Sequence, residues 1–122
     1  MNSWKKITLN PEKNIKDAIN VLDNEAQGIV LISDSDNKLL GTVTDGDIRR
    51  AFINNFKFET LLKDIMFKDP TFASANDSKE LILSIMKSKD IMQIPILDNN
   101  GKIIGLETIK YILDRKKIDN PV

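Results

Sequence analysis

Two polar residues, Thr44 and Asp47, have the types and the spacing to bind a small anion. They follow a short apolar run and come just before Ile48, so we expect them where a strand ends and a helix begins. The first turn of a helix carries unpaired backbone N–H groups and the positive end of the helix dipole, which attract phosphate. The same pair also matches a capping box, which would satisfy backbone N–H groups without any ligand. The sequence leaves both interpretations open, and one pair could do both.

Two adjacent arginines follow this pair. Arg49 and Arg50 could bind a phosphate through the bidentate geometry of the guanidinium group, which lysine lacks. Neighbouring arginines on a helix are also typical of a solvated face that binds nothing. Both interpretations stay open at this point.

The composition excludes most covalent chemistry. The 122 residues include no Cys and no His, which excludes disulfides, the usual zinc sites and imidazole or thiolate catalysis. The acidic stretch 34–37 resembles the start of a calcium loop, but Lys38 and Leu39 stand where such a loop needs an oxygen ligand and a glycine. The segment 41–47 lacks the Gly-Lys-Ser/Thr ending of a phosphate-binding P-loop. We therefore expect no catalytic residue, no metal site and no bound cofactor.

The charge balance argues against large anionic partners. Basic and acidic residues number 18 each, so the net charge is zero and no positive field would hold nucleic acid or an anionic membrane. The first ten residues include Lys5 and Lys6 but no apolar core of a signal peptide. We expect a cytoplasmic protein that binds neither nucleic acid nor membrane.

The elements that would position Thr44 and Asp47 occur twice. The stretches 31–44 and 95–108 match in pattern and lie 64 positions apart, with Gly41 and Gly105 at equivalent places. A constant offset predicts two copies of one supersecondary unit packed about a pseudo-two-fold axis, with matched crevices between them. Neither copy could bury enough apolar surface alone, so we expect one folding unit with its function between the halves.

Hydrophobic periodicity predicts the order helix, strand, strand, helix in each half. In the first half we expect a helix over 15–22, strands over 29–32 and 39–43 around a polar turn, and a second helix from Asp47. The corresponding elements of the second half are expected at 81–86, 94–97, 103–106 and 109–113. Asp77 with Glu80 predicts the start of the third helix, and Leu61–Met66 predict a short packed helical connector.

This pattern resembles a tandem pair of cystathionine-β-synthase (CBS) domains, known as a Bateman module. Repeat two resembles the family most closely at Gln93–Lys102, and repeat one at Gly41–Arg50. The resemblance implies an α/β fold of two CBS-type βαββα repeats packed about a pseudo-two-fold axis, with two small sheets face to face and helices outside. It assigns residues 1–60 to CBS repeat 1 and residues 61–122 to CBS repeat 2.

The resemblance also implies a nucleotide site. In the family, the hydroxyl at the position of Thr44 generally contacts phosphate, and the carboxylate at the position of Asp47 accepts hydrogen bonds from the ribose. The base would lie against Gly28, Ile29, Thr71, Phe72, Met92 and Gln93. In repeat two, Tyr111 stands at the position equivalent to Asp47, so we expect one competent crevice and one degenerate crevice beside Thr108.

The string Thr-Asp-Gly-Asp-Ile-Arg-Arg at 44–50 resembles more specifically the CBS pair that precedes a sugar-1-phosphate nucleotidylyltransferase domain, and the tail Asp119–Val122 resembles the point where that domain would begin. The Gly-rich loop that such a transferase needs is absent, so we expect a non-catalytic regulatory fragment. It would sense an adenosine phosphate or a related nucleotide. The alternative is a ligand-free scaffold that holds the attached catalytic domains together, and a homodimer through the helices is expected in either case.

Overall fold

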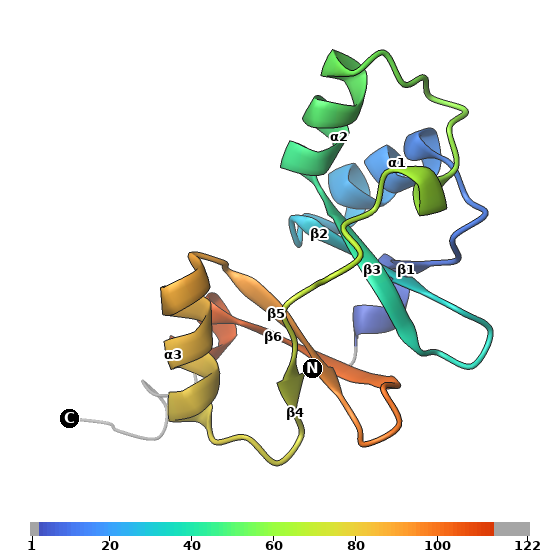
Figure 1. Ribbon diagram of the computed structural model, residues 1–122. Coiled ribbons are helices and arrows are strands. Elements are labelled where there is room, and N and C mark those ends of the chain that lie inside the picture. The colour runs from blue at the N-terminus through green and yellow to red at the C-terminus, as the bar shows by residue number, and fades with distance from the viewer. Residues whose placement is uncertain (1–2, 114–122) are drawn as a thin grey trace.

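Each repeat folds into a three-stranded sheet with helices against its outer face (Figure 1). The computed structural model describes residues 3–113 of the chain. Repeat one contains η1 (Ser3–Ile7), β1 (Thr8–Leu9), α1 (Ile15–Glu25), β2 (Ile29–Ser33), β3 (Leu39–Thr44) and α2 (Asp45–Ile53). After the short 3₁₀ helix η2 (Leu62–Asp64), repeat two contains β4 (Ala73–Ser74), α3 (Lys79–Lys89), β5 (Gln93–Leu97) and β6 (Ile103–Thr108), and residues 109–113 are helical. The predicted α/β architecture of two repeats is confirmed.

The two sheets have the same topology and register. In each sheet a two-residue strand runs parallel to the middle strand, which pairs antiparallel with the third strand. Leu9 lies opposite Ile32 in repeat one, and Ala73 lies opposite Ile96 in repeat two, again 64 positions apart. β2 and β5 are therefore central strands, which explains why their sequences are almost continuously apolar.

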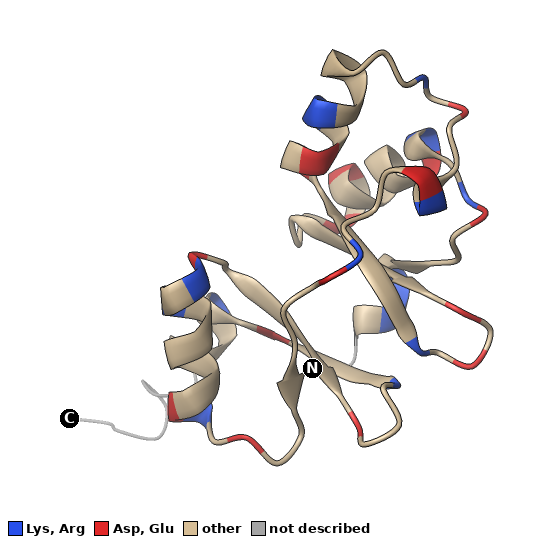
Figure 2. Cartoon of the chain, in the orientation of Figure 1, with Lys and Arg blue, Asp and Glu red and all other residues tan. Residues whose placement is uncertain are grey.

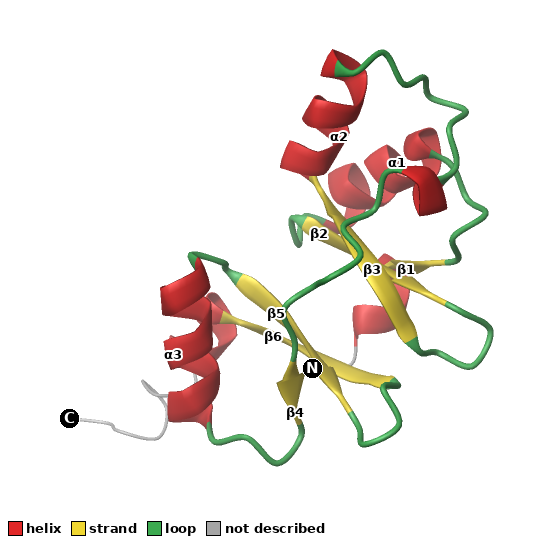
Figure 3. Cartoon of the chain, in the orientation of Figure 1, coloured by secondary structure: helices red, strands yellow, loops and turns green. Residues whose placement is uncertain are grey.

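The core has three parts, which correspond to two outer layers and one central layer. Val30, Ile32 and Val43 of the first sheet pack against α1 and α2, and Ile94 of the second sheet packs against α3. The central layer lies between the sheets and consists of Trp4, Ile7, Ile29, Leu31, Leu97, Ile103 and Leu106. Figure 3 shows the strands in the middle of the molecule, with α1 and α2 on one side and α3 on the other.

The tips of the two hairpins meet at the pseudo-two-fold axis. Lys38 and Lys102, which are equivalent residues, form an isolated antiparallel bridge. The N–H of Leu39 donates to the carbonyl of Gly101 (3.1 Å), and the N–H of Ile103 donates to the carbonyl of Asn37 (2.9 Å). These two hydrogen bonds are exchanged by the pseudo-symmetry, as in an isologous interface.

The acidic turns have a structural role. The Asp34 carboxylate accepts the N–H groups of Asp36 and Lys38, and Asp98 does the same in repeat two for Asn100 and Lys102. Each aspartate thus stabilises its own turn. Within residues 3–113, no group of three or more His, Cys, Asp or Glu side chains could hold a metal ion.

Several predicted details differ from the structure. The second helix begins at Asp45 rather than Asp47, because Thr44 is the N-cap. The prediction that α3 starts at Asp77 is wrong: Ser78 is the N-cap and accepts from the N–H of Leu81 (3.1 Å), whereas the Asp77 carboxylate accepts from the N–H of Ser74. Sequence reasoning also did not locate β1 and β4, which have two residues each.

The connector packs on repeat one. Leu62 is fully buried in the first core, and Phe67 pairs with Thr42 at the edge of β3. The boundary at residue 60 stays a prediction, and the tail Asp119–Val122 lies outside the described residues.

Charged residues of both signs are distributed over both repeats (Figure 2). None of the described helices is long and apolar enough to cross a membrane.

Candidate functional site

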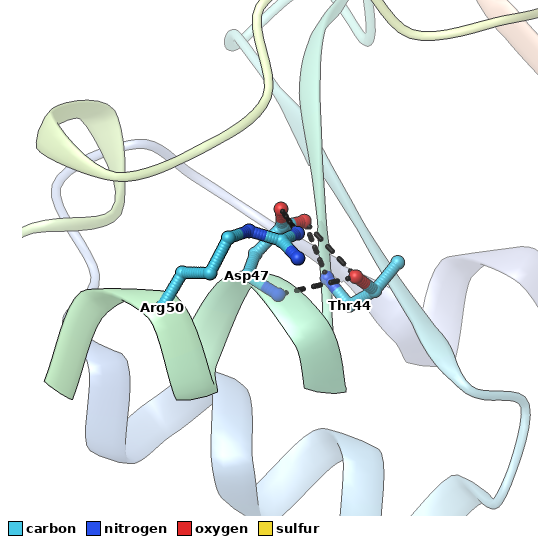
Figure 4. A network of polar contacts seen from close by, with 3 residues as sticks. All are labelled: Thr44, Asp47 and Arg50. Atoms are coloured by element: carbon cyan, nitrogen blue, oxygen red, sulfur yellow. Dashed lines mark hydrogen bonds and ion pairs between the residues drawn. The ribbon is translucent and has the colours of Figure 1, made fainter. Parts of the chain in front are cut away.

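Thr44 and Asp47 form a complete capping box where β3 passes into α2 (Figure 4). The Asp47 carboxylate accepts through Oδ2 from the backbone N–H of Thr44 (2.9 Å) and from the Thr44 hydroxyl (3.1 Å). In return, Thr44 Oγ1 accepts from the N–H of Asp47 (3.4 Å). The capping interpretation of this pair is therefore confirmed.

Arg50 binds the other oxygen of the same carboxylate. Its Nη2 donates to Asp47 Oδ1 at 2.7 Å, one helical turn from Asp47, while its own side chain is 63% exposed and that of Asp47 only 14%. The guanidinium group lies over the first turn of α2, because a Cβ placed on Gly46 would stand 3.2 Å from Arg50 Nη1. Arg49 is exposed and does not line the cavity described next.

A cavity of about 430 Å³ opens beside this pair, within the size range of small-molecule sites. Repeat one lines it with Ile29, Thr42, Thr44, Asp47 and Arg50, and repeat two with Asp90, Ile91, Met92, Gln93 and Pro95. The segment between the repeats completes the wall with Phe67, Pro70 and Thr71. The cavity thus combines an apolar wall with one helix N-terminus, two carboxylates and one guanidinium group.

Six of the eight predicted binding residues line this cavity, namely Ile29, Thr44, Asp47, Thr71, Met92 and Gln93. Gly28 is not part of the lining, but it lies at its edge. Its φ is +76°, and a Cβ there would stand 3.1 Å from Gln93 Nε2, so glycine permits both the turn and the close approach of Gln93. Phe72 does not line the cavity, and its side chain is 55% exposed.

Sequence reasoning missed part of the lining. Thr42, Phe67, Pro70, Asp90, Ile91 and Pro95 enter the cavity wall through tertiary packing. One signal was available for Thr42, because it alternates with Val43 and so shares a face of β3 with Thr44. Asp90 gave no such signal, since it is the left-handed C-cap of α3 (φ +56°).

The equivalent place in repeat two lacks the same polar set. Thr108 caps the helix at 109–113 by accepting from the N–H of Tyr111 (3.0 Å). Leu106 replaces Thr42 and is buried in the central layer with Trp4 and Ile7. Tyr111 replaces Asp47, so no carboxylate stands at that position.

Comparison with known proteins identifies the family. The CBS domain model matches residues 2–54 and again residues 62–116, so the chain belongs to the CBS domain family and carries a tandem pair of these domains. Inosine-5'-monophosphate dehydrogenase of Methanocaldococcus jannaschii is 30% identical over 111 residues. The match covers 91% of this chain and 22% of that enzyme, so the chain spans about a fifth of the length of this curated relative.

Solved structures of CBS proteins share the fold. CBSX2, described in complex with AMP, matches with a TM-score of 0.81 and 19% identity, over 93% of this chain and 89% of that one. The CBS domain protein PAE2072 of Pyrobaculum aerophilum, also described as complexed with AMP, matches with a TM-score of 0.76 and 16% identity, over 94% and 97% of the two chains. Both neighbours are thus CBS proteins that bind an adenine nucleotide.

Proposed function

We propose that this CBS pair is a regulatory module that binds one adenine nucleotide in the cavity between its repeats. The carrying observation is that the cavity brings the Thr44–Asp47 pair of repeat one opposite Met92 and Gln93 of repeat two. The first turn of α2 and the Thr44 hydroxyl would bind a phosphate, for which the hydroxyl proton would turn from Asp47 Oδ2 to the ligand. The Asp47 carboxylate would accept from ribose hydroxyls. The apolar wall around Ile29 and Pro95 would receive the base.

The complexes of two structural neighbours with AMP support an adenine nucleotide as the ligand. A ligand that contacts both repeats can act as a regulator if it binds one arrangement of the repeats more tightly than another, because only differential affinity shifts an equilibrium. The central layer and the hairpin bridge also join the two repeats. A nucleotide bound in the cavity would therefore strengthen or weaken contacts that the repeats already make.

The test is isothermal titration of the chain with AMP, ATP, GTP and CMP, repeated on Asp47→Ala. That substitution also removes half of a capping box, which alone costs about 1 kcal/mol of stability. Asp17→Ala is the matched control, because Asp17 forms the same capping box with Asn14 at the start of α1, with both hydrogen bonds at 3.0 Å.

We expect saturable binding of an adenine nucleotide near one site per chain. Asp47→Ala should abolish this binding, and Asp17→Ala should retain it with a comparable loss of stability. Absence of binding heat with every nucleotide would contradict the proposal. An equal loss of nucleotide affinity in Asp47→Ala and Asp17→Ala would also contradict it.

The alternative function, a scaffold that holds attached enzymes together, is favoured by one observation. Exposed apolar side chains lie in the last turn of α2 and in the segment after it, namely Phe52, Ile53, Phe56 and Phe58. The rings of Phe52 and Phe58 stack edge-to-face, with their centroids 5.1 Å apart. Exposed apolar clusters are common at interfaces between subunits. Light scattering in the titration buffers would separate the two functions: a scaffold is a dimer that binds no nucleotide.

The enzyme that the module would regulate is part of the proposal as well. We propose a sugar-1-phosphate nucleotidylyltransferase domain as the attached enzyme, on the resemblance of the string at 44–50 to CBS pairs that precede such a domain. The match to an inosine-5'-monophosphate dehydrogenase supports the more general idea that modules of this type accompany larger enzymes.

A further inference from the structure

We propose that Arg50 makes the cavity selective for phosphorylated nucleosides over bare nucleosides, an inference that rests on the proposed function. Both oxygens of the Asp47 carboxylate accept hydrogen bonds within the chain. Oδ2 accepts from the backbone N–H and the hydroxyl of Thr44, and Oδ1 accepts the 2.7 Å hydrogen bond from Arg50 Nη2. Oδ2 thus accepts two hydrogen bonds and Oδ1 accepts one, which leaves the carboxylate about one further acceptor site. Two ribose hydroxyls that bind Asp47 together therefore compete with the Arg50 guanidinium group for Oδ1.

The charges around the cavity make this competition depend on phosphate. Among the described residues that line the cavity, Arg50 is the one cation, and it stands with two carboxylates, Asp47 and Asp90. A nucleoside that displaces Arg50 offers it no anion in exchange. A nucleoside monophosphate offers a phosphate, which binds a guanidinium group in bidentate geometry.

The geometry places Arg50 where such an exchange can occur. Its guanidinium group lies over Gly46 in the first turn of α2, which is also the end of the helix that attracts phosphate. The Thr44 hydroxyl and the Arg50 guanidinium group both donate to the Asp47 carboxylate, so the two groups lie near each other (Figure 4).

Arg50 also has space to move. Arg50 and Asp47 also line a second cavity of about 300 Å³, together with Asp64 of η2. The ion pair thus borders two cavities, and the exposed guanidinium group can leave Asp47 without entering a packed core.

The experiment compares the affinities of AMP and adenosine for the wild-type chain, Arg50→Ala and Arg49→Ala. Arg49→Ala is the matched control, because it removes the same charge from the neighbouring, exposed position of the same helix, outside the cavity lining. Alanine is a good helix former, so both variants should fold.

In the wild-type chain we expect AMP to bind more tightly than adenosine. Arg50→Ala should weaken AMP binding by roughly tenfold or more, the value of a charge-assisted hydrogen bond. It should strengthen adenosine binding, because Asp47 Oδ1 is then free to accept from the ribose. These two effects have opposite signs, which identifies a role of Arg50 in specificity. If Arg50 were only structural, Arg50→Ala would weaken the binding of both ligands. Arg49→Ala should change either affinity by less than about threefold.

Three results overturn the inference. If Arg50→Ala leaves the AMP-to-adenosine ratio unchanged, or if Arg49→Ala lowers it equally, Arg50 does not determine the selectivity, even though the proposed function stands. If the wild-type chain binds neither ligand, the proposed function fails and the inference fails with it.

Discussion

Asp47 combines two duties in one side chain. It stabilises the first turn of α2 through Oδ2, which accepts from the N–H of Thr44, and it lines the cavity while its Oδ1 accepts from Arg50. The residue types at 44 and 47 were enough to predict both a helix cap and a ligand site. The position of the Arg50 guanidinium group over Gly46 could not be predicted from the sequence, because the rotamer of the Arg50 side chain depends on the surrounding structure.

The two repeats differ at a pair of positions that is buried in repeat one. In repeat one, Ile15 and Val43 are fully buried in the first core. In repeat two, the equivalent residues are Lys79 and Glu107, which form an ion pair of 3.3 Å. Glu107 is buried, whereas the Lys79 side chain is 48% exposed. A buried carboxylate is costly to desolvate, so an apolar pair in this place is often at least as stable.

We therefore expect the double variant Lys79→Ile with Glu107→Val to have a free energy of unfolding equal to or slightly above that of the wild type. Lys79→Ile alone should lower it, because it takes an ammonium group away from a buried carboxylate. Urea denaturation of the three proteins measures both effects. If the double variant is less stable than the wild type, the ion pair stabilises this site more than an apolar pair does, and the expectation is wrong.

At the scale of elements, the prediction succeeded where a segment was long and periodic. Ile29–Ser33 and Ile15–Glu25 have clear apolar patterns, and both were predicted close to their observed bounds. β1 and β4 were not located because two residues are too few to show an alternating pattern. Their pairing with β2 and β5 is a tertiary event that no local signal encodes.

The edge of β3 gives an example of such a tertiary contact. The N–H of Thr42 donates to the carbonyl of Phe67 (3.1 Å), and the N–H of Phe67 donates to the carbonyl of Thr42 (2.9 Å). A Cβ on Gly41 would stand 2.7 Å from the Phe67 carbonyl oxygen and 2.9 Å from Met66 Sδ. Glycine at 41 therefore lets the connector approach the sheet.

Gly41→Ala should lower the free energy of unfolding by about 1–3 kcal/mol, because backbone must move to remove the overlap. Gly105→Ala is the matched control in repeat two, where the nearest atom to the added Cβ is 3.8 Å away. It should be neutral or slightly stabilising, since alanine restricts the unfolded chain. Thermal denaturation of the two variants tests this difference, and equal effects would contradict it.

At the scale of the whole molecule, the pseudo-two-fold axis makes the repeats interdependent. The central layer takes Ile29 and Leu31 from repeat one and Leu97, Ile103 and Leu106 from repeat two. The constant offset of 64 predicted this packing, whereas the contact of η1 with β6 could not be predicted from the sequence. Trp4, the single tryptophan, lies in this layer and is 7% exposed.

We expect the two repeats to unfold in a single cooperative transition, because neither has a complete core alone. Trp4 fluorescence reports the layer between the sheets, and far-UV circular dichroism reports the helices. The two probes should give the same urea midpoint. Separate midpoints would mean that the repeats fold independently.

The most direct test of nucleotide binding between the repeats is a titration of the ¹⁵N-labelled chain with AMP, followed by NMR. We expect the amide signals of Thr44–Asp47 and Ile91–Gln93 to shift together and to saturate near one equivalent, with Thr108–Tyr111 largely unchanged. Such a result would place one nucleotide in the crevice of the capping box. No saturable shift at Thr44–Asp47, or equal shifts at Thr108–Tyr111, would contradict a single nucleotide site in this crevice.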